Sequence, residues 1–362
     1  MKYLVYGYYG YNNLGDDLLL DTIINRTKEK DKEASFVVLN KSSDNLKEYP
    51  NVYYSNVRDI LHSSKNKISK FLYFFKMFKN YIDECDVFLL GGGTIFMDSS
   101  KASFLMVYLS FFVSYAKSIG KKVVLIGVGI DILNNFFSIV SMKKILRNSD
   151  FVYCRDALSF QIAKKLNSTS NALLAQDLVF GSYWNNSVLR DDSVVYCGHK
   201  TIGISLIDYS DKYGENYIPE INNILNHYIK KGFKIKLLSF QINTDKADNL
   251  FYEQLIHHEN IEIVNLNINN FYEQFNALDY VLSMRFHGIV LGVLFHKYTL
   301  GIVHEVKNQQ LCLETGVDYL FLNDLTLDKV VNRDFRISDA EMLAKLALSS
   351  GANFDFMSRS EI

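Results

Sequence analysis

The sequence has little proline and little cysteine. Only Pro50 and Pro219 occur in 362 residues, which excludes proline-rich linkers and collagen-like repeats. No Cys-x-x-Cys pair and no His-Glu-x-x-His spacing is present, so neither a metal nor a disulfide framework is expected. Each cysteine lies in or beside an apolar run, which predicts buried thiols. The four are Cys85, Cys154, Cys197 and Cys312.

An excess of charge of one sign is also missing. Lys and Arg number 39 and Asp and Glu number 40, so the formal net charge is −1. This balance excludes a protein that coats duplex nucleic acid by charge alone, although it permits a local basic pocket. Hydrophobic residues make up 48% and charged residues 22%, as in globular proteins. The length suits two domains of roughly 150–200 residues each.

No apolar run reaches the roughly 18–20 residues that a membrane span needs. Residues 102–116 are apolar but contain three serines, which favours a helix buried against a sheet. Residues 71–81 are aromatic and carry Lys76 and Lys79, which leaves open a peripheral contact with a membrane. The N-terminal apolar run stops at Gly7 and has no signal-peptide pattern. We therefore expect a cytoplasmic protein, and the aromatic segment leaves open a position at the inner face of the membrane.

Strand-like and helical segments alternate along the chain. This rhythm predicts parallel sheets covered by helices on both faces, in an α/β fold. A loop-like stretch at 183–199 divides two such series, so two Rossmann-like, doubly wound domains facing a cleft are expected. The predicted domains are 1–185 and 186–337, followed by a helical tail at 338–362 for which a return to the first domain is left open. Predicted strands cover 3–6, 35–39, 87–90, 123–126, 151–154, 202–206, 233–238, 261–264, 280–283 and 298–302.

Two glycine-rich clusters follow predicted strands, where ligands bind in such folds. The first runs from Gly7 to Asp17 and opens a helix, so its backbone N–H groups suit an anionic or hydroxyl-rich ligand. Its plainer interpretation is a helix start capped by Asp16. The second, Gly91 to Thr94 with Asp98 beyond it, predicts either a backbone cradle or a tight turn. A third run at 127–131 favours close packing of the sheet.

Three further clusters carry cations. Arg155 follows a strand, where it either binds carboxylate or phosphate or pairs with Asp156 to order a helix start. Arg285 and His287 lie two residues apart before an apolar helix, which places a fixed cation and a proton-exchanging group together. Lys307 follows the next strand, as a second cation or as part of a solvated loop.

Taken in order, these clusters resemble the polysaccharide pyruvyl transferase family. Its Gly-x-x-Gly-x-x-Asn-x-Gly-Asp loop matches residues 7–16, and its Gly-Gly-Gly element with a later Asp matches 91–98. Its Arg-Asp-x-x-Ser element matches 155–159, and its Ser-x-Arg-x-His-Gly element matches 283–288. A lysine after the next strand corresponds to Lys307. The first and the Ser-x-Arg-x-His-Gly elements are specific when they occur together.

The resemblance implies a two-domain fold like that of GT-B glycosyltransferases and a ketal-forming transferase. Such enzymes move the pyruvyl group of phosphoenolpyruvate onto two hydroxyls of a hexose or N-acetylhexosamine in a bacterial capsule or exopolysaccharide precursor, often lipid-linked. Phosphoenolpyruvate is a co-substrate, and no cofactor, metal or nucleic-acid partner is expected. The predicted catalytic residues are His287, Asp16 and Asp98. The predicted donor site is Arg285, Arg155, Lys307 and Gly288. The predicted acceptor site is Gly10, Asn13, Gly15, Asp16, Gly92, Gly93 and Thr94.

Three other functions fit the same pattern less well. A GT-B glycosyltransferase would bind a nucleotide sugar at the same helix start, but the second domain has no strong nucleotide signature. A sugar-nucleotide epimerase would share the architecture. A non-catalytic saccharide-binding protein is disfavoured because Arg285 and His287 are both present.

Overall fold

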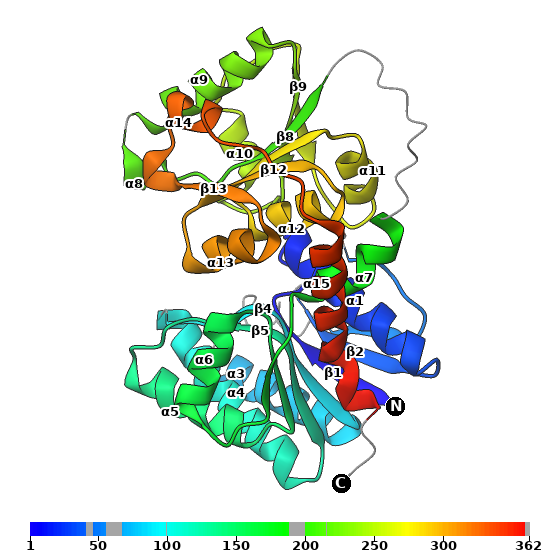
Figure 1. Cartoon of the computed structure of the whole chain (residues 1–362). Coiled ribbons are helices and arrows are strands. Elements are labelled where there is room, and N and C mark those ends of the chain that lie inside the picture. The colour runs from blue at the N-terminus through cyan, green and yellow to red at the C-terminus, as the bar shows by residue number, and fades with distance from the viewer. Residues whose placement is uncertain (41–45, 56–66, 99, 188–199, 215, 359–362) are drawn as a thin grey trace. The chain divides into compact units, whose positions relative to one another are not determined.

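A computed structural model describes residues 1–40, 46–55, 67–98, 100–187, 200–214 and 216–358 (Figure 1). The chain forms two compact α/β units. The first comprises Met1–Tyr11, Asp16–Ser182 and Leu346–Ile362, and the second comprises Asn12–Gly15 and Tyr183–Lys345. Both units are therefore assembled from segments that are far apart in the sequence.

The first unit contains a seven-stranded parallel sheet in the order β3-β2-β1-β4-β5-β6-β7. Its central strands are continuous apolar runs, such as the buried Val-Val-Leu-Ile of β5, because helices cover both faces of a parallel sheet. The strands are β1 (Lys2–Tyr6), β2 (Ser35–Leu39), β3 (Val52–Ser55), β4 (Val87–Phe96), β5 (Lys122–Ile130), β6 (Phe151–Cys154) and β7 (Ala172–Leu174).

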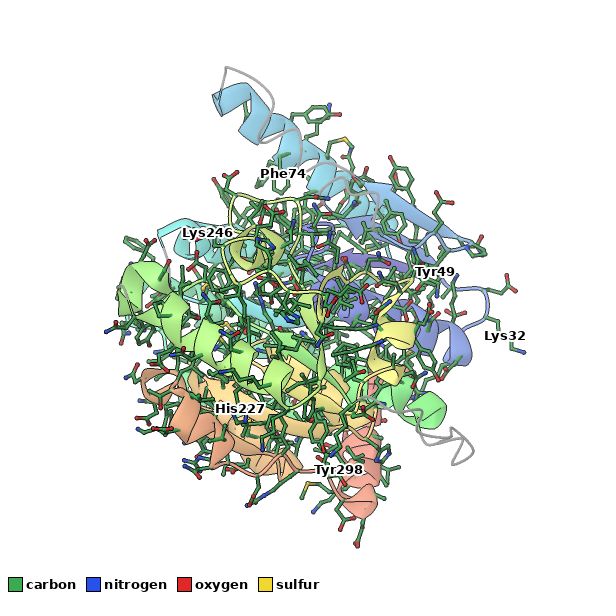
Figure 2. The ribbon with its side chains drawn as sticks, turned by 90° about the horizontal axis from the view of Figure 1, so that it is seen from above. Lys32, Tyr49, Phe74, His227, Lys246 and Tyr298 are labelled. Carbon is green, nitrogen blue, oxygen red and sulfur yellow. The ribbon has the colours of Figure 1, made fainter. Side chains whose placement is uncertain are left out.

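Four helices of this unit form a layer in which α3 packs on α4, α4 on α5, and α5 on α6. Phe74 of α3, labelled in Figure 2, and Phe112 of α4 are buried in the core beneath this layer. The helices of the layer are α3 (Lys67–Glu84), α4 (Ser100–Ser118), α5 (Phe136–Arg147) and α6 (Ala157–Leu166). The remaining long helices are α1 (Leu14–Lys30), α7 (Leu178–Ser187) and α15 (Ala340–Gly351), and the 3₁₀ helix η2 (Ala352–Met357) follows α15.

The second unit contains a six-stranded parallel sheet in the order β10-β9-β8-β11-β12-β13. Its strands are β8 (Thr201–Ser205), β9 (Lys234–Ser239), β10 (Ile261–Asn265), β11 (Tyr280–Ser283), β12 (Tyr298–Val303) and β13 (Asp318–Phe321). Its helices are α8 (Ser210–Tyr213), α9 (Tyr217–Lys230), α10 (Asp248–Tyr252), α11 (Phe271–Asn276), α12 (Phe286–Leu294), α13 (Val306–Thr315) and α14 (Leu327–Val331), with the 3₁₀ helix η1 (Leu322–Asp324).

Each sheet has a switch point, where the chain leaves two neighbouring strands in opposite directions. In the first unit it lies between β1 and β4, and in the second between β8 and β11. Ligands of open α/β sheets bind outside the carboxyl ends of strands at such points. The glycine clusters after β1 and in β4, and the Arg285–His287 pair after β11, occupy these positions.

The predicted α/β architecture is confirmed, but several boundaries were wrong. Strand β4 does not stop at the glycines; it continues to Phe96, because Gly91 admits the close approach of the Ile126 carbonyl from β5. Helix α1 begins at Leu14, so Asp16 lies in its first turn and does not cap it. Residues 183–187 are helical in α7 and not loop, while 188–199, including Cys197, lie outside the described residues.

Three short strands, β3, β7 and β13, were not predicted, and the sequence gives them only three or four residues each. Cys85, Cys154 and Cys312 are buried free thiols, as predicted. Within the described part of the chain, no helix is both long and apolar enough to cross a membrane.

Candidate functional site

The first candidate site lies at the carboxyl ends of β1 and β4. The Tyr9 hydroxyl donates to the Gly91 carbonyl at 2.5 Å, which ties the loop after β1 to β4. Gly92 and Gly93 have φ of 74° and 91°, values that favour glycine. A Cβ on Gly93 would lie 3.3 Å from Asp16 Oδ1, so this glycine leaves space beside the Asp16 carboxylate. The structure therefore brings together Asp16 and the predicted acceptor glycines of β4.

Asp17, next to Asp16 in the first turn of α1, is a buried carboxyl group. Burial is the main cause that raises its pKa to about 7, and the Asp16 charge acts in the same direction, while the Gly10 N–H group lowers it. A carboxyl group with this pKa exchanges protons near neutral pH, as a general acid or base must. The sequence analysis had named Asp17 only as the end of the first glycine-rich cluster.

Replacing Asp17 with Asn should remove a pH dependence of stability. The folded-state pKa lies above the ordinary 3.8, so the folded protein binds the proton more tightly than the unfolded chain. Wild-type stability should therefore fall as the pH rises from 4 to 7, by up to about 4 kcal/mol relative to the variant. Urea unfolding across this range measures the difference. The exposed Asp211→Asn serves as control, and parallel curves for wild type and Asp17→Asn would contradict the prediction.

Arg155 occupies the carboxyl end of β6, also in the first unit. Its guanidinium group is 4% exposed and donates to the Thr94 hydroxyl at 2.6 Å. The carboxylates of Asp156 and Asp177 lie 3.5 Å and 4.0 Å from it. Gly129 of β5 has no side chain where Thr94 and Arg155 meet. Arg155, a predicted donor-binding residue, therefore lies beside Thr94, a predicted acceptor-binding residue. Two carboxylates already lie near the positive charge of Arg155.

The rest of the Arg-Asp-x-x-Ser element orders the local structure. Asp156 caps α6 by accepting from the Ser159 N–H at 2.7 Å. The Ser159 hydroxyl accepts from the Ile130 N–H at 2.8 Å and joins this turn to β5. The pairing of Arg155 with Asp156 at a helix start, which the sequence analysis kept as an alternative, is therefore present.

Asp98 is engaged with the loop that precedes α5. Its carboxylate accepts from the N–H groups of Asn134 and Asn135. Burial acts to raise the pKa of Asp98, but hydrogen bonds from Ser138, Asn135 and Asn134 outweigh it, so the pKa lies below the usual value. A carboxylate of this kind is a weak base, and its contacts indicate that it holds the loop.

The second candidate site lies at the carboxyl ends of β9, β11 and β12. Arg285, between β11 and α12, forms an ion pair with Asp248, the first residue of α10. Asp248 is 2% exposed and also accepts from the N–H groups of Phe240 at 2.9 Å and Gln241 at 3.2 Å. Burial raises the pKa of Asp248 despite the Arg285 charge. A buried carboxylate thus fixes the guanidinium group.

His287 lies in the first turn of α12, where the helix N-terminus favours negative charge. Gly15 packs against its imidazole, and a Cβ there would collide with Nδ1. Asn13 belongs to the same unit, since it pairs with Gln241 and its side chain accepts from the Gly15 N–H at 3.1 Å. Gly288 is buried against Ser283, so it brings α12 close to β11. The predicted acceptor residues Asn13 and Gly15 therefore belong to the same unit as His287.

Lys307 and His304 follow β12. Lys307 forms an ion pair with Glu305. His304 is buried, and burial lowers its pKa; the Glu305 charge opposes this effect, whereas the charges of Lys307 and Arg285 add to it. These interactions place Arg285, His304 and Lys307 in one electrostatic neighbourhood. A cavity of about 330 Å³ opens beside it, lined in part by His304, Glu305, Lys212 and Gln309.

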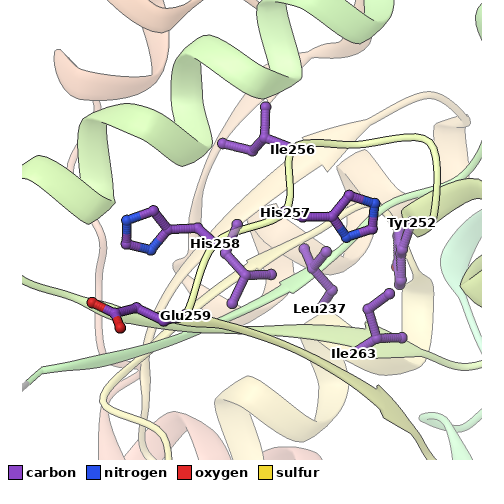
Figure 3. A pocket seen from close by; sticks show the side chains of 8 residues that line it. Leu237, Tyr252, Ile256, His257, His258, Glu259 and Ile263 are labelled. Atoms are coloured by element: carbon purple, nitrogen blue, oxygen red, sulfur yellow. The ribbon is translucent and has the colours of Figure 1, made fainter.

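A larger cavity of about 480 Å³ lies elsewhere in the second unit (Figure 3). Leu237 and Ile263 line its apolar part, and His257, His258 and Glu259 surround it on the loop before β10. That loop is at the amino end of β10, and the cavity contains none of the predicted site residues. Among the described residues, no group of three or more His, Cys, Asp or Glu side chains is placed to hold a metal.

Three residues of these sites were not found from the sequence. Asp248 is the first residue of α10, and Asp177 directly precedes α7. An acidic residue is common at a helix N-terminus because the helix dipole favours it there, so neither position stands out in the sequence. Asp248 meets Arg285 from 37 positions away, and no spacing pattern signals that contact. Tyr209, whose ring lies 5.5 Å from that of His304, follows β8 in a segment with no motif.

Comparison with solved structures identifies the fold class. The chain is similar to UDP-GlcNAc 2-epimerase from Methanocaldococcus jannaschii, with a TM-score of 0.67 and 11% identity over 99% of both chains. It is also similar to the enzyme of this name from Neisseria meningitidis bound to UDP-GlcNAc, with a TM-score of 0.61 and 12% identity over 99% of this chain and 100% of that one. A third similar structure is UDP-N-acetylglucosamine 2-epimerase from Rickettsia bellii, with a TM-score of 0.60 and 10% identity over 99% of this chain and 95% of that one. These likenesses confirm a GT-B-like fold.

The family model described as polysaccharide pyruvyl transferase matches residues 13–305. A sequence search of proteins with curated functions gives no match. The match spans most of the chain, from Asn13 to Glu305, and includes the Arg285–His287 pair. The chain belongs to the polysaccharide pyruvyl transferase family and is a transferase.

Proposed function

We propose that the protein transfers the pyruvyl group of phosphoenolpyruvate to two hydroxyls of a hexose or N-acetylhexosamine, forming a cyclic ketal in a surface polysaccharide precursor. The observation that carries this proposal is the place of Arg285 directly before α12, where its charge and that of Lys307 both act on His304, with His287 following in the first turn of that helix. In a chain of net charge −1, this neighbourhood gathers the cations that a carboxylate and a phosphate require.

The donor would bind in the second unit. Arg285 is held in place by Asp248, so its outer N–H groups are oriented before the donor arrives. Lys307 pairs with Glu305 on a partly exposed side chain, and an incoming phosphate or carboxylate would compete with Glu305 for it. Arg155 lies in the first unit, beside Thr94. Its contact with the donor stays a prediction of the sequence analysis.

The reaction requires one proton at the methylene carbon of phosphoenolpyruvate. Protonation makes C2 an electrophile, a sugar hydroxyl oxygen bonds to it, and the bond between C2 and the phosphate oxygen breaks. A second hydroxyl then closes the ketal. Of the two protons that the hydroxyls lose, one balances the new methyl group and the other leaves with phosphate. We assign His287 to this proton transfer.

Asp16 and its neighbour Asp17 are proposed to orient and deprotonate the sugar hydroxyls. Gly93 has no side chain beside the Asp16 carboxylate, which leaves room there for a neutral ring. Asp17, with a pKa of about 7, supplies a proton acceptor at neutral pH. Asp98 is proposed to shape this site through the loop before α5, because its oxygens already accept from backbone N–H groups.

Mass spectrometry of a glycoside panel tests the proposal. Lipid-linked and synthetic hexosides and N-acetylhexosaminides are incubated with the protein and phosphoenolpyruvate. The expected result is a product heavier by one pyruvic acid minus one water, with one phosphate released for each product. A control acceptor with one of the two hydroxyls methylated should give no ketal. Transfer from a nucleotide sugar, with no reaction of phosphoenolpyruvate on any acceptor, would contradict the proposal.

A further inference from the structure

The α3–α5 layer of the first unit exposes large apolar side chains. Phe136 and Phe137, at the start of α5, are 71% and 66% exposed, and Ile132 just before them is 61% exposed. Adjacent exposed apolar groups of this size mark an interaction surface. Further exposed apolar side chains of the layer are Leu72 and Tyr73 on α3, Val107 and Phe111 on α4, and Val140 on α5.

The outward side of α5 carries apolar side chains at its start and basic side chains at its end. Its first turns expose Phe136, Phe137 and Val140, and its last turns carry basic side chains. The inward side is a separate set, formed by Ser138, Ser141, Met142, Ile145 and Leu146. A helix with aromatic side chains and cations on its outward side has the character of an interfacial helix, which buries the rings and leaves the cations among polar head groups.

The layer is also strongly basic. Helices α3, α4 and α5 together contain nine Lys or Arg residues and two acidic residues, an excess of seven positive charges in a chain whose net charge is −1. Of the two acidic residues, Asp83 pairs with Lys79. Four exposed cations of these three helices have no ion pair with any described residue: Lys76, Lys143, Lys144 and Arg147.

We propose that this layer, defined by the outward side chains of α3, α4 and α5, docks on a membrane surface rich in anionic phospholipid. The rings of α5 would enter the interface, and the cations would meet the lipid phosphates. A second copy of the chain is a poorer occupant, because two faces that each carry these unpaired cations repel each other. The inference does not depend on the identity of the transferred group, although it suits a lipid-linked acceptor.

Sedimentation of the full-length protein with vesicles tests this surface. Vesicles of phosphatidylcholine with phosphatidylglycerol should bind the protein, and pure phosphatidylcholine should bind it much more weakly. Phe136→Ser with Phe137→Ser should lower the partition coefficient roughly tenfold or more. Replacing Lys143, Lys144 and Arg147 with Gln should lower it about a hundredfold, since each cation near such a surface contributes about fivefold.

Matched controls lie outside the layer. Leu348→Ser removes an apolar side chain that is 79% exposed, and Lys230→Gln with Lys231→Gln removes two exposed cations. Both controls should bind vesicles as the wild type does. If the Phe variant folds poorly, the Gln variant and the salt dependence of wild-type binding still test the membrane-docking proposal. Equal binding to both vesicle types, or full binding by either α5 variant, would overturn the proposal. So would a wild-type dimer that the Phe variant converts to a monomer.

Discussion

Replacing His287 with Ala is expected to lower turnover by about 10²–10⁴-fold. This is the usual contribution of a positioned general acid or base. The imidazole lies in the first turn of α12 against Gly15 and is partly exposed, so its loss should leave the core intact. Release of phosphate from phosphoenolpyruvate in the presence of an accepted glycoside measures turnover, and a melting curve measures the fold.

His227→Ala is the matched control, because it removes the same side chain from α9, which contributes no residue to the site; His227 is labelled in Figure 2. This control should retain full turnover. If His287→Ala also retained it, the proton transfer would belong to another group, and His304 would be the next residue to test.

Replacing Arg285 with Ala is expected to affect both stability and donor binding. The change leaves the buried Asp248 carboxylate without its cation, and breaking a buried ion pair from one side costs about 3–5 kcal/mol. The donor concentration needed for half-maximal rate should rise sharply, because the guanidinium fork no longer meets the donor anion. Urea unfolding and the donor dependence of the rate measure the two effects.

Two further variants separate these effects. Arg285→Lys keeps a cation beside Asp248 but loses the planar fork, so stability should recover more than donor affinity. Adding Asp248→Asn to Arg285→Ala should restore stability but not donor binding. The stability loss of Arg285→Ala should also shrink at acidic pH, where Asp248 is protonated. An unchanged donor dependence in Arg285→Ala would exclude this residue from the donor site.

The sequence predicted the α/β fold well because parallel strands buried on both faces are continuous apolar runs that glycine and polar residues delimit. The loops after β1 and β11 stood out because their glycine, arginine and histidine spacing is unusual. What remained hidden depends on contacts between distant segments. Asp248 meets Arg285 only because β9 and β11 both pair with β8, so their carboxyl ends share one edge.

The glycines of β4 and β5 show a second limit. Glycine at the end of an apolar run predicts a turn as readily as a strand that continues. Which of the two forms depends on the segment that packs against the glycine. Gly91 stays inside β4 because the Ile126 backbone comes close, and Gly127 takes φ of 56° against Leu178. Neither neighbour is near in sequence to the glycine that it constrains. For the same reason, a triplet of glycines indicated a ligand cradle and a tight turn equally well.

Asn353 is made late in synthesis but completes hydrogen bonds of the first unit. Its side chain accepts from the Gly127 N–H at 2.9 Å and donates to the Gln176 carbonyl at 3.0 Å. The sheet that contains Gly127 therefore leaves the ribosome before Asn353 is made. Until then the Gly127 N–H group lacks this hydrogen-bond acceptor. At about 5–20 residues per second, the interval after residue 182 is roughly ten to thirty seconds. Throughout that time the first unit lacks the hydrogen bonds that Asn353 supplies to Gly127 and Gln176.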